Sequence, residues 1–155
     1  MRKKRKTILL ICLAAVLVLL AGCQGGEKPL TTVSQALDNA REKAGVETTV
    51  MDSEDLDMLL GIQSDEVAEG ALYVASEPLQ GDMLALFKAA NDAAAEHIRQ
   101  ALENYLTQRI SETENYLPDV CALLRQGQVR RDGLRVYMAV SAQRDAVMAA
   151  LEEGR

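Results

Sequence analysis

Two pairs of short apolar segments alternate along this chain with segments of helical period, and this order restricts the folds open to it. Residues 71–75 and 83–87 form the first pair, with turn-forming residues between them. Residues 128–131 and 134–140 form the second pair and flank Asp132-Gly133, a dipeptide suited to the positive φ angles of a two-residue hairpin turn. Apolar runs of this length, bounded by turn residues, predict two antiparallel hairpins.

Helical period covers most of the remaining chain. The first helix begins at Thr32 or Ser34, either of which can cap it, and ends near Lys43, since Gly45 follows. The other helical segments cover residues 52–60, 91–116, 118–124 and 141–153. Apolar side chains of each segment fall on one face, which is the pattern of helices packed against a core.

This order of elements predicts an α+β domain over residues 32–155. The two hairpins join into a four-stranded antiparallel sheet with helices on one face, because two such layers bury every apolar stripe. The 133 residues after Gly22 suffice for one domain with one core.

The N-terminus has the pattern of a bacterial lipoprotein signal peptide over residues 1–22. Residues 2–6 are basic, residues 8–21 are apolar, and Leu20, Ala21 and Gly22 precede Cys23. The apolar run is shorter than the ~20 residues of a transmembrane helix, and it lacks the polar face of a core helix. An ordinary signal peptide, cleaved without lipidation, is the remaining alternative, and a cysteine directly after Leu-Ala-Gly argues against it.

Cleavage after Gly22 makes Cys23 the first residue of the mature protein and its site of lipidation. The thiol accepts a diacylglyceryl group, and at least two acyl chains, such as palmitate, are needed because a single chain binds a membrane only marginally. Residues 23–31, which are polar and rich in Gly, form a flexible tether. We therefore expect a protein anchored through Cys23 to the extracytoplasmic face of the cell membrane.

The net charge excludes one class of partner. After Gly22 the chain carries 12 basic and 23 acidic residues, a net charge of −11. Nucleic-acid binding depends on Lys and Arg that neutralise phosphates, so we expect no nucleic-acid partner. An acidic surface also repels anionic headgroups, which leaves the lipid on Cys23 as the expected contact with the membrane.

Catalytic patterns are absent from the sequence. It contains no G-x-S-x-G, glycine-rich phosphate loop, H-E-x-x-H or C-x-x-C. The single histidine, His97, is predicted to be solvated or at a boundary rather than a catalytic base. Once Cys12 leaves with the signal peptide and Cys23 carries the lipid, Cys121 has no disulfide partner. Its apolar neighbours predict a buried side chain, with a reactive thiol as the alternative. We predict no catalytic residue and no cofactor.

An acidic stretch is the one candidate for ion binding. Its carboxylates belong to Asp52, Glu54, Asp55, Asp57, Asp65, Glu66 and Glu69. The spacing departs from that of a calcium loop, because Leu56 occupies the third ligand position and no glycine follows it. Carboxylates in a first turn stabilise the positive end of a helix. Helix capping and a solvated face are therefore favoured over a metal site.

Aromatic residues are scarce, so an exposed one would mark a binding surface. Tyr105 and Tyr137 are predicted in the core or at its edge. Tyr116, beside Asn115 and Pro118, is predicted to be exposed.

Several short motifs resemble one family. They are Leu59-Leu60-Gly61-Ile62 with Asp65-Glu66-Val67, the segment Met83–Ala89 leading into Asn91-Asp92, the Asn115–Pro118 break and the Asp132-Gly133 hairpin. Together they are similar to domain of unknown function 4358, found in small lipoproteins of Gram-positive anaerobes. The resemblance spans about Thr32 to Leu151 and implies a location on the outer face of a cytoplasmic membrane. It implies no activity and no catalytic residue, because the family has none assigned.

The leading hypothesis is a non-enzymatic module that binds a protein, such as an unidentified envelope protein, or another envelope component. The alternative is a small-ligand-binding lipoprotein associated with a transporter, although one compact domain lacks the two-lobed cleft usual for such receptors. An enzyme comes third. A deep pocket with converging polar groups would favour the receptor, an exposed apolar patch the interaction module, and two facing carboxylates the enzyme.

Overall fold

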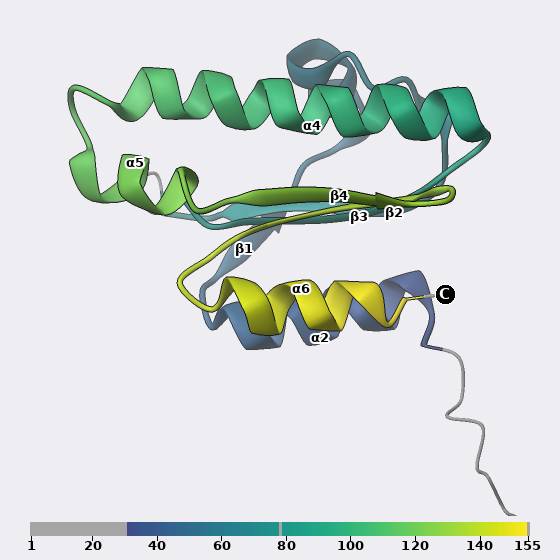
Figure 1. Cartoon of the computed structure of the whole chain (residues 1–155), viewed down its shortest axis with the longest axis horizontal. Coiled ribbons are helices and arrows are strands. Elements are labelled where there is room, and N and C mark those ends of the chain that lie inside the picture. The colour runs from purple at the N-terminus through teal and green to yellow at the C-terminus, as the bar shows by residue number, and fades with distance from the viewer. Residues whose placement is uncertain (1–30, 78, 155) are drawn as a thin grey trace, which may run out of the picture.

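The computed structural model describes residues 31–154 apart from residue 78, and its fold has three layers. Helices α4 (Asp92–Thr113) and α5 (Pro118–Leu124) lie on one face of an open sheet, while α2 (Val33–Ala44) and α6 (Arg144–Glu152) cover the other (Figure 1). The α+β class is confirmed. The prediction that helices cover one face is wrong, because the central strands are apolar on both sides and each side needs a helical layer.

The sheet has five strands in the order β1-β2-β3-β5-β4, and all described pairs are antiparallel. The strands are β1 (Thr48–Val50), β2 (Val67–Ala75), β3 (Met83–Ala89), β4 (Gln128–Asp132) and β5 (Arg135–Val140). The two predicted hairpins are β2–β3 and β4–β5, and pairing of β3 with β5 joins them as expected. The prediction of four strands is wrong, because β1 pairs with residues 73–75 and extends the sheet beyond β2.

Strand β1 is short and is held in place by α2. Its sequence, Thr48-Thr49-Val50, is β-branched throughout, which favours an extended backbone. The Arg41 Nε donates to Thr48 Oγ1 at 3.0 Å, and the Arg41 guanidinium lies 4.6 Å from the centre of the Tyr73 ring. These contacts tie the last turn of α2 to both β1 and β2.

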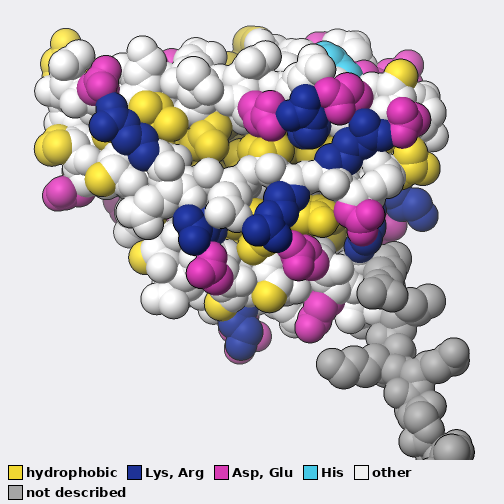
Figure 2. Space-filling model, in the orientation of Figure 1, with side chains coloured by type: hydrophobic (Ala, Val, Ile, Leu, Met, Phe, Trp, Pro, Cys, Tyr) yellow, Lys and Arg dark blue, Asp and Glu magenta, His cyan; other side chains and the backbone are white. Residues whose placement is uncertain are grey.

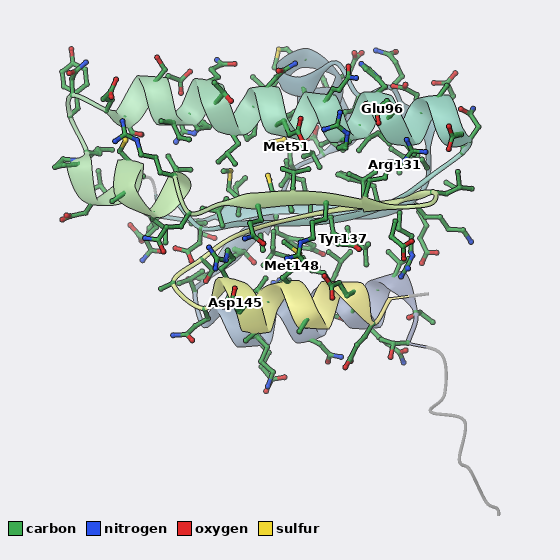
Figure 3. All side chains as sticks on the ribbon, in the orientation of Figure 1. Met51, Glu96, Arg131, Tyr137, Asp145 and Met148 are labelled. Atoms are coloured by element: carbon green, nitrogen blue, oxygen red, sulfur yellow. The ribbon has the colours of Figure 1, made fainter. Side chains whose placement is uncertain are left out.

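Residues of the central strands alternate between two hydrophobic cores. On β3, Phe87 packs in the core under α4, while Leu86 packs in the core formed with α2 and α6. Figure 3 shows the same division, with Met51 on the α4 side of the sheet and Tyr137 and Met148 on the α6 side. The prediction that residues 134–140 bury only one face is therefore wrong.

Most predicted helix boundaries are confirmed. Thr32 caps α2 in a reciprocal capping box with Gln35, and Gly45 ends the helix in the left-handed conformation. Asn91 caps α4 by accepting from the Ala94 backbone N–H at 2.9 Å. The inward residues predicted for these two helices are buried at Val33, Ala36, Leu37, Ala40, Ala94, Ile98, Ala101 and Leu102.

The last helix begins later than predicted. Ser141 is buried, and its Oγ accepts from the Gln143 N–H at 3.1 Å in the turn that precedes α6. The helix itself starts at Arg144. Because of this later start, the face of the helix that points into the core differs from the predicted one. Ala146 is exposed, and Met148 is buried in its place.

The hairpin turn between β4 and β5 is also shifted by one residue. Asp132 pairs with Arg135, so the two turn residues are Gly133 and Leu134 rather than Asp132 and Gly133. Gly133 has a φ of 60°, and no described residue other than glycine has a positive φ. A glycine at the first of two turn positions is the pattern of a type II′ turn.

The segment between β1 and β2 forms three short helical turns. They are α3 (Ser53–Asp55), the π-helical turn η1 (Leu56–Leu60) and the 3₁₀ turn η2 (Ser64–Glu66). Leu56 is buried as predicted, whereas Leu59 is half exposed. Gly61 ends η1 in the left-handed conformation, as the sequence indicates.

Candidate functional site

The predicted lipidation site lies outside the described residues. This applies to Cys23 and to Leu20, Ala21 and Gly22 before it. The described chain begins at Thr31, which forms a bridge with Gly154 just after α6. In the part of the chain that the structure describes, no helix is both long and apolar enough to cross a bilayer.

The acidic stretch caps two helical turns. Asp52 Oδ1 accepts from the backbone N–H groups of Glu54 and Asp55 at 3.0 and 2.9 Å. Glu66 Oε2 accepts from the Gln63 N–H at 2.9 Å. The capping prediction is confirmed at these positions, and over residues 31–77 and 79–154 no group of three His, Cys, Asp or Glu side chains is arranged to hold a metal.

His97 pairs with one of these carboxylates across the fold. Its Nδ1 lies 2.7 Å from Glu66 Oε1 and joins α4 to η2. Burial raises the pKa of Glu66, but the hydrogen bonds from Gln63 and His97 outweigh it and leave that pKa below the ordinary value. The prediction of a solvated or boundary histidine holds for its half-exposed side chain, although the partner was not foreseen.

Arginines in the described chain pair with carboxylates mostly around α4, β4, β5 and α6. The pairs outside α2 join Arg99 to Glu96 and Glu103, Arg109 to Glu112, Arg125 to Glu114, Arg130 to Glu152, Arg131 to Asp92 and Glu96, Arg135 to Asp132, and Arg144 to Asp145. Figure 2 shows the molecule from the side of the β4 edge, where basic and acidic groups alternate on the surface. Exposed pairs of this kind contribute only about 0.2–1 kcal/mol each.

Glu96 is the centre of the densest of these networks. It accepts from Arg99 at 2.6 Å, from Gln100 at 2.8 Å and from Arg131 at 3.1 Å. The hydrogen bond from Arg99, followed by those from Gln100 and Arg131, lowers the pKa of Glu96 to about 2. Glu96 and Arg131 approach each other from α4 and β4 in Figure 3, so the network fastens the long helix to the edge strand.

The opposite edge of the sheet has a different charge balance. Residues 44–87 include ten Asp or Glu and no Lys, Arg or His. Among the described residues, ion pairs reach one of these ten carboxylates, Glu66, whose partner is His97. The negative charge of the chain is therefore largely uncompensated around β1, β2 and the segment that links them.

A cavity opens at this acidic edge, where β1 stops and β2 continues. Its volume is about 260 Å³, and its lining includes Val50, Leu56, Ile62, Val67 and Gly70. Ser53, Gln63 and Ser64 also line it. We refer to residues 67–72 of β2 together with this cavity as the β2-edge site.

Exposed apolar side chains lie near the same segment. Six large hydrophobic residues are exposed in the described chain, and three of them, Val50, Met58 and Leu59, fall within ten residues of sequence. Val50 lines the cavity itself and is 50 % exposed. The β2-edge site thus combines an apolar hollow with exposed Val50. Its lining residues adjoin four acidic residues in sequence, which we call its acidic rim: Asp52, Glu54, Asp65 and Glu69.

A smaller cavity contains the buried carboxyl of the described core. Asp82 is 8 % exposed, and the cavity beside it, of about 130 Å³, is also lined by Glu77, Tyr105 and Arg109. Burial raises the pKa of Asp82, although a hydrogen bond with Ser141 opposes the shift. The hydrogen bond with Ser141 gives this buried carboxyl a partner within the fold.

The remaining candidate side chains lie largely as the sequence predicts. Cys121 is buried, with its Sγ 3.8 Å from the Ile110 carbonyl oxygen. Tyr137 is buried, Tyr105 is partly buried, and Tyr116 is 83 % exposed.

Sequence reasoning did not find the β2-edge site. Its cavity depends on β1, a three-residue strand, and on residues up to 21 positions apart in the chain. One signal was readable, namely the absence of Lys and Arg between Lys43 and Lys88.

Comparison with known proteins identifies a family. The model of the family described as "Domain of unknown function (DUF4358)" matches residues 39–141, about two thirds of the chain, and the chain belongs to this family. The resemblance noted in the sequence is thus confirmed. No curated protein and no solved structure matches the chain.

Proposed function

We propose that this member of the DUF4358 family is a lipoprotein anchored through Cys23 to the extracytoplasmic face of the cell membrane, where it acts as a non-enzymatic interaction module. The anchor rests on the basic and apolar N-terminus and on Leu20, Ala21 and Gly22 before the cysteine. The partner is a protein of the cell envelope.

The observation that carries the interaction role is the β2-edge site. Monomeric proteins generally cover or charge the edges of their sheets, because an open edge pairs with other chains. Here the edge of β2 beyond β1 is flanked by an apolar cavity and by exposed Val50. Features of this kind are typical of a surface that another protein covers.

The same geometry supports a small-ligand receptor less well. Ligand pockets usually have volumes of roughly 300–1,000 Å³ and a few converging polar groups. The cavities at β2 and at Asp82, of about 260 and 130 Å³, are smaller than this. A groove of about 440 Å³ between α4 and β4 is large enough for a ligand. It lies along the edge strand, however, and its lining includes the polar side chains of Glu103, Thr107 and Arg130, whereas ligand pockets are mostly apolar. An interaction module is therefore the better-supported proposal.

The anchor is tested by substitution of the lipidated cysteine. Cells that express the Cys23→Ser variant, supplied with a clickable fatty-acid analogue, should lose the label on this protein and release it from the membrane fraction. Cys12→Ser is the matched control, because Cys12 lies within the apolar run and should not carry lipid. Undiminished labelling of the Cys23→Ser variant would contradict the anchor.

The interaction role is tested in intact cells. Photo-crosslinking from position 50, which lines the β2-edge site, should give a discrete adduct with another protein. A crosslinker at position 42, on the exposed face of α2, is the control and should give no such adduct. If neither position captures a protein, the interaction role is wrong.

A further inference from the structure

The outer side of β2 has no strand partner over part of its length. On the β3 side, the Ala75 N–H donates to the backbone carbonyl oxygen of Asp82 at 2.8 Å. On the β1 side, the Leu72 carbonyl oxygen accepts from the Met51 N–H, also at 2.8 Å. Because backbone groups alternate along a strand, the Ala71 N–H lies on the β3 side like that of Ala75, and the Gly70 C=O of the same peptide is directed to the β1 side. β1 pairs with residues 73–75 only, so no described strand pairs with that side of β2 beyond Leu72.

A bulge lies at the start of this part of β2. The register with β3 shifts between Val67 and Glu69, and Gly70 has a φ of 132°. A Cβ at Gly70 would lie 2.1 Å from the Leu86 carbonyl oxygen, so this position has room for hydrogen only. Gly70 therefore remains paired with β3 and adds no side chain to the cavity that it lines.

The cavity is large enough to receive one side chain of an added strand. A cavity of about 150 Å³ can hold a benzene ring, and the cavity at the β2 edge has about 260 Å³. Leu56, Ile62 and Val67 give it apolar walls. Strand addition combines backbone hydrogen bonds with pockets for alternate side chains, and the β2-edge site offers both.

The charge around the site selects the partner. In sequence, Asp52 and Glu54 flank the cavity residue Ser53, Asp65 follows Ser64, and Glu69 precedes Gly70. None of these four carboxylates has an ion-pair partner among the described residues. A segment with Lys or Arg at positions that alternate with an apolar residue would complement both the rim and the cavity.

We propose that the β2-edge site binds an extended, basic segment of an envelope protein, which adds to the sheet as a strand beside β2 and places an apolar side chain in the cavity. The proposal rests on the proposed interaction role and names the surface and chemistry that carry it.

The other edge of the sheet has a different charge balance. The edge strand β4 carries Arg130 and Arg131, which pair with Glu152, Asp92 and Glu96. The charges on β4 are therefore paired within the described chain, whereas Glu69 on β2 has no ion-pair partner there.

The test uses the full protein, purified from membranes in a neutral detergent, and a short fluorescent peptide of alternating lysine and valine. The peptide should bind with a measurable anisotropy change at low salt. A peptide with serine in place of valine should bind more weakly, because it leaves the cavity unfilled. A peptide N-methylated on alternate residues should fail to bind, since it cannot complete the backbone hydrogen bonds.

A charge reversal at the rim localises the binding. Glu69→Lys replaces an attraction with a repulsion and should weaken binding of the lysine–valine peptide about tenfold at low salt, with a smaller effect at high salt. Glu42→Lys makes the same change on α2 and should leave binding unaltered. Circular dichroism and urea unfolding establish that both variants are folded.

Several results would overturn the proposal. They are no binding of the lysine–valine peptide, equal binding of the N-methylated peptide, and equal weakening by Glu69→Lys and Glu42→Lys. Self-association that Glu69→Lys abolishes would assign the edge to a second copy and would also overturn it. If position 50 still captures an envelope protein in cells after any of these results, the interaction role stands and only the strand-addition mode is wrong.

Discussion

Substitution of Gly70 by alanine should destabilise the fold far more than substitution of other glycines with positive φ. Gly70 has a φ of 132°, and a non-glycine residue in such a region costs about 1–3 kcal/mol. The added Cβ would also lie 2.1 Å from the Leu86 oxygen and 2.7 Å from the Phe87 Cα. These are backbone atoms of the central strand β3, so they cannot rotate away as a side chain would.

Relief of this clash requires the start of β2 to separate from β3. That movement breaks the pairing of Val67 and Glu69 with Ala89 and Lys88. Each ladder hydrogen bond contributes about 0.5–1.5 kcal/mol, so two lost bonds add about 2 kcal/mol to the strain. We expect a total loss of about 3–5 kcal/mol for Gly70→Ala, a large part of the roughly 5–15 kcal/mol that stabilises a domain.

Gly45→Ala is the matched control for this measurement. Gly45 has a φ of 69°, and a Cβ there would meet nothing within 4 Å. Its cost is the left-handed backbone alone, about 1–2 kcal/mol. Urea unfolding, followed by far-UV circular dichroism, gives the free energy of unfolding of each variant. If Gly70→Ala costs no more than Gly45→Ala, β2 yields without loss of pairing and the account of the bulge is wrong.

Three further outcomes test the core, a cap and a buried charge. Phe87→Ala, which empties a fully buried position on β3, should lower the free energy of unfolding by about 3–5 kcal/mol in the same urea assay; a loss below about 1 kcal/mol would contradict its core position. Asn91→Ala removes the acceptor for the Ala94 N–H and should cost about 1 kcal/mol, whereas Asn91→Asp should cost little. Burial raises the pKa of Asp82, so the folded state holds this proton more tightly than the unfolded chain and stability falls as pH rises through the raised pKa. The Asp82→Asn variant, which can still bond to Ser141, should gain stability relative to the parent protein between pH 4 and pH 7, and a constant difference across that range would refute the shift.

The elements that could be predicted from sequence are those whose signals are local. The capping box of Thr32 with Gln35 and the end of α2 at Gly45 depend on residues within one turn. The β2–β3 and β4–β5 hairpins likewise pair segments that are adjacent in the chain. In each case the residue pattern and the structure that it stabilises occupy the same stretch of sequence.

The elements that could not be predicted depend on distant partners. β1 is too short to show an alternating pattern, and Arg41 holds it through contacts with Thr48 and Tyr73. The second helical layer was missed because alternation in β5 was interpreted as one buried and one open face. Tyr137 and Ala139, on the face taken as open, are covered by the α2–α6 layer, which comes from opposite ends of the described chain.

The acidic stretch shows how a correct local interpretation can still miss a site. Asp52 and Glu66 do cap helical turns, as their positions predict. Capping, however, explains where two carboxylates bond and not why the stretch lacks basic partners. The arginines that neutralise the rest of the surface follow Lys88 in sequence and lie around α4 and the β4 edge, with Arg41 of α2 as the exception. Folding therefore concentrates uncompensated charge at the edge where β1 stops short of covering β2, and the proposal of a basic partner rests on this coincidence rather than on the acidity itself.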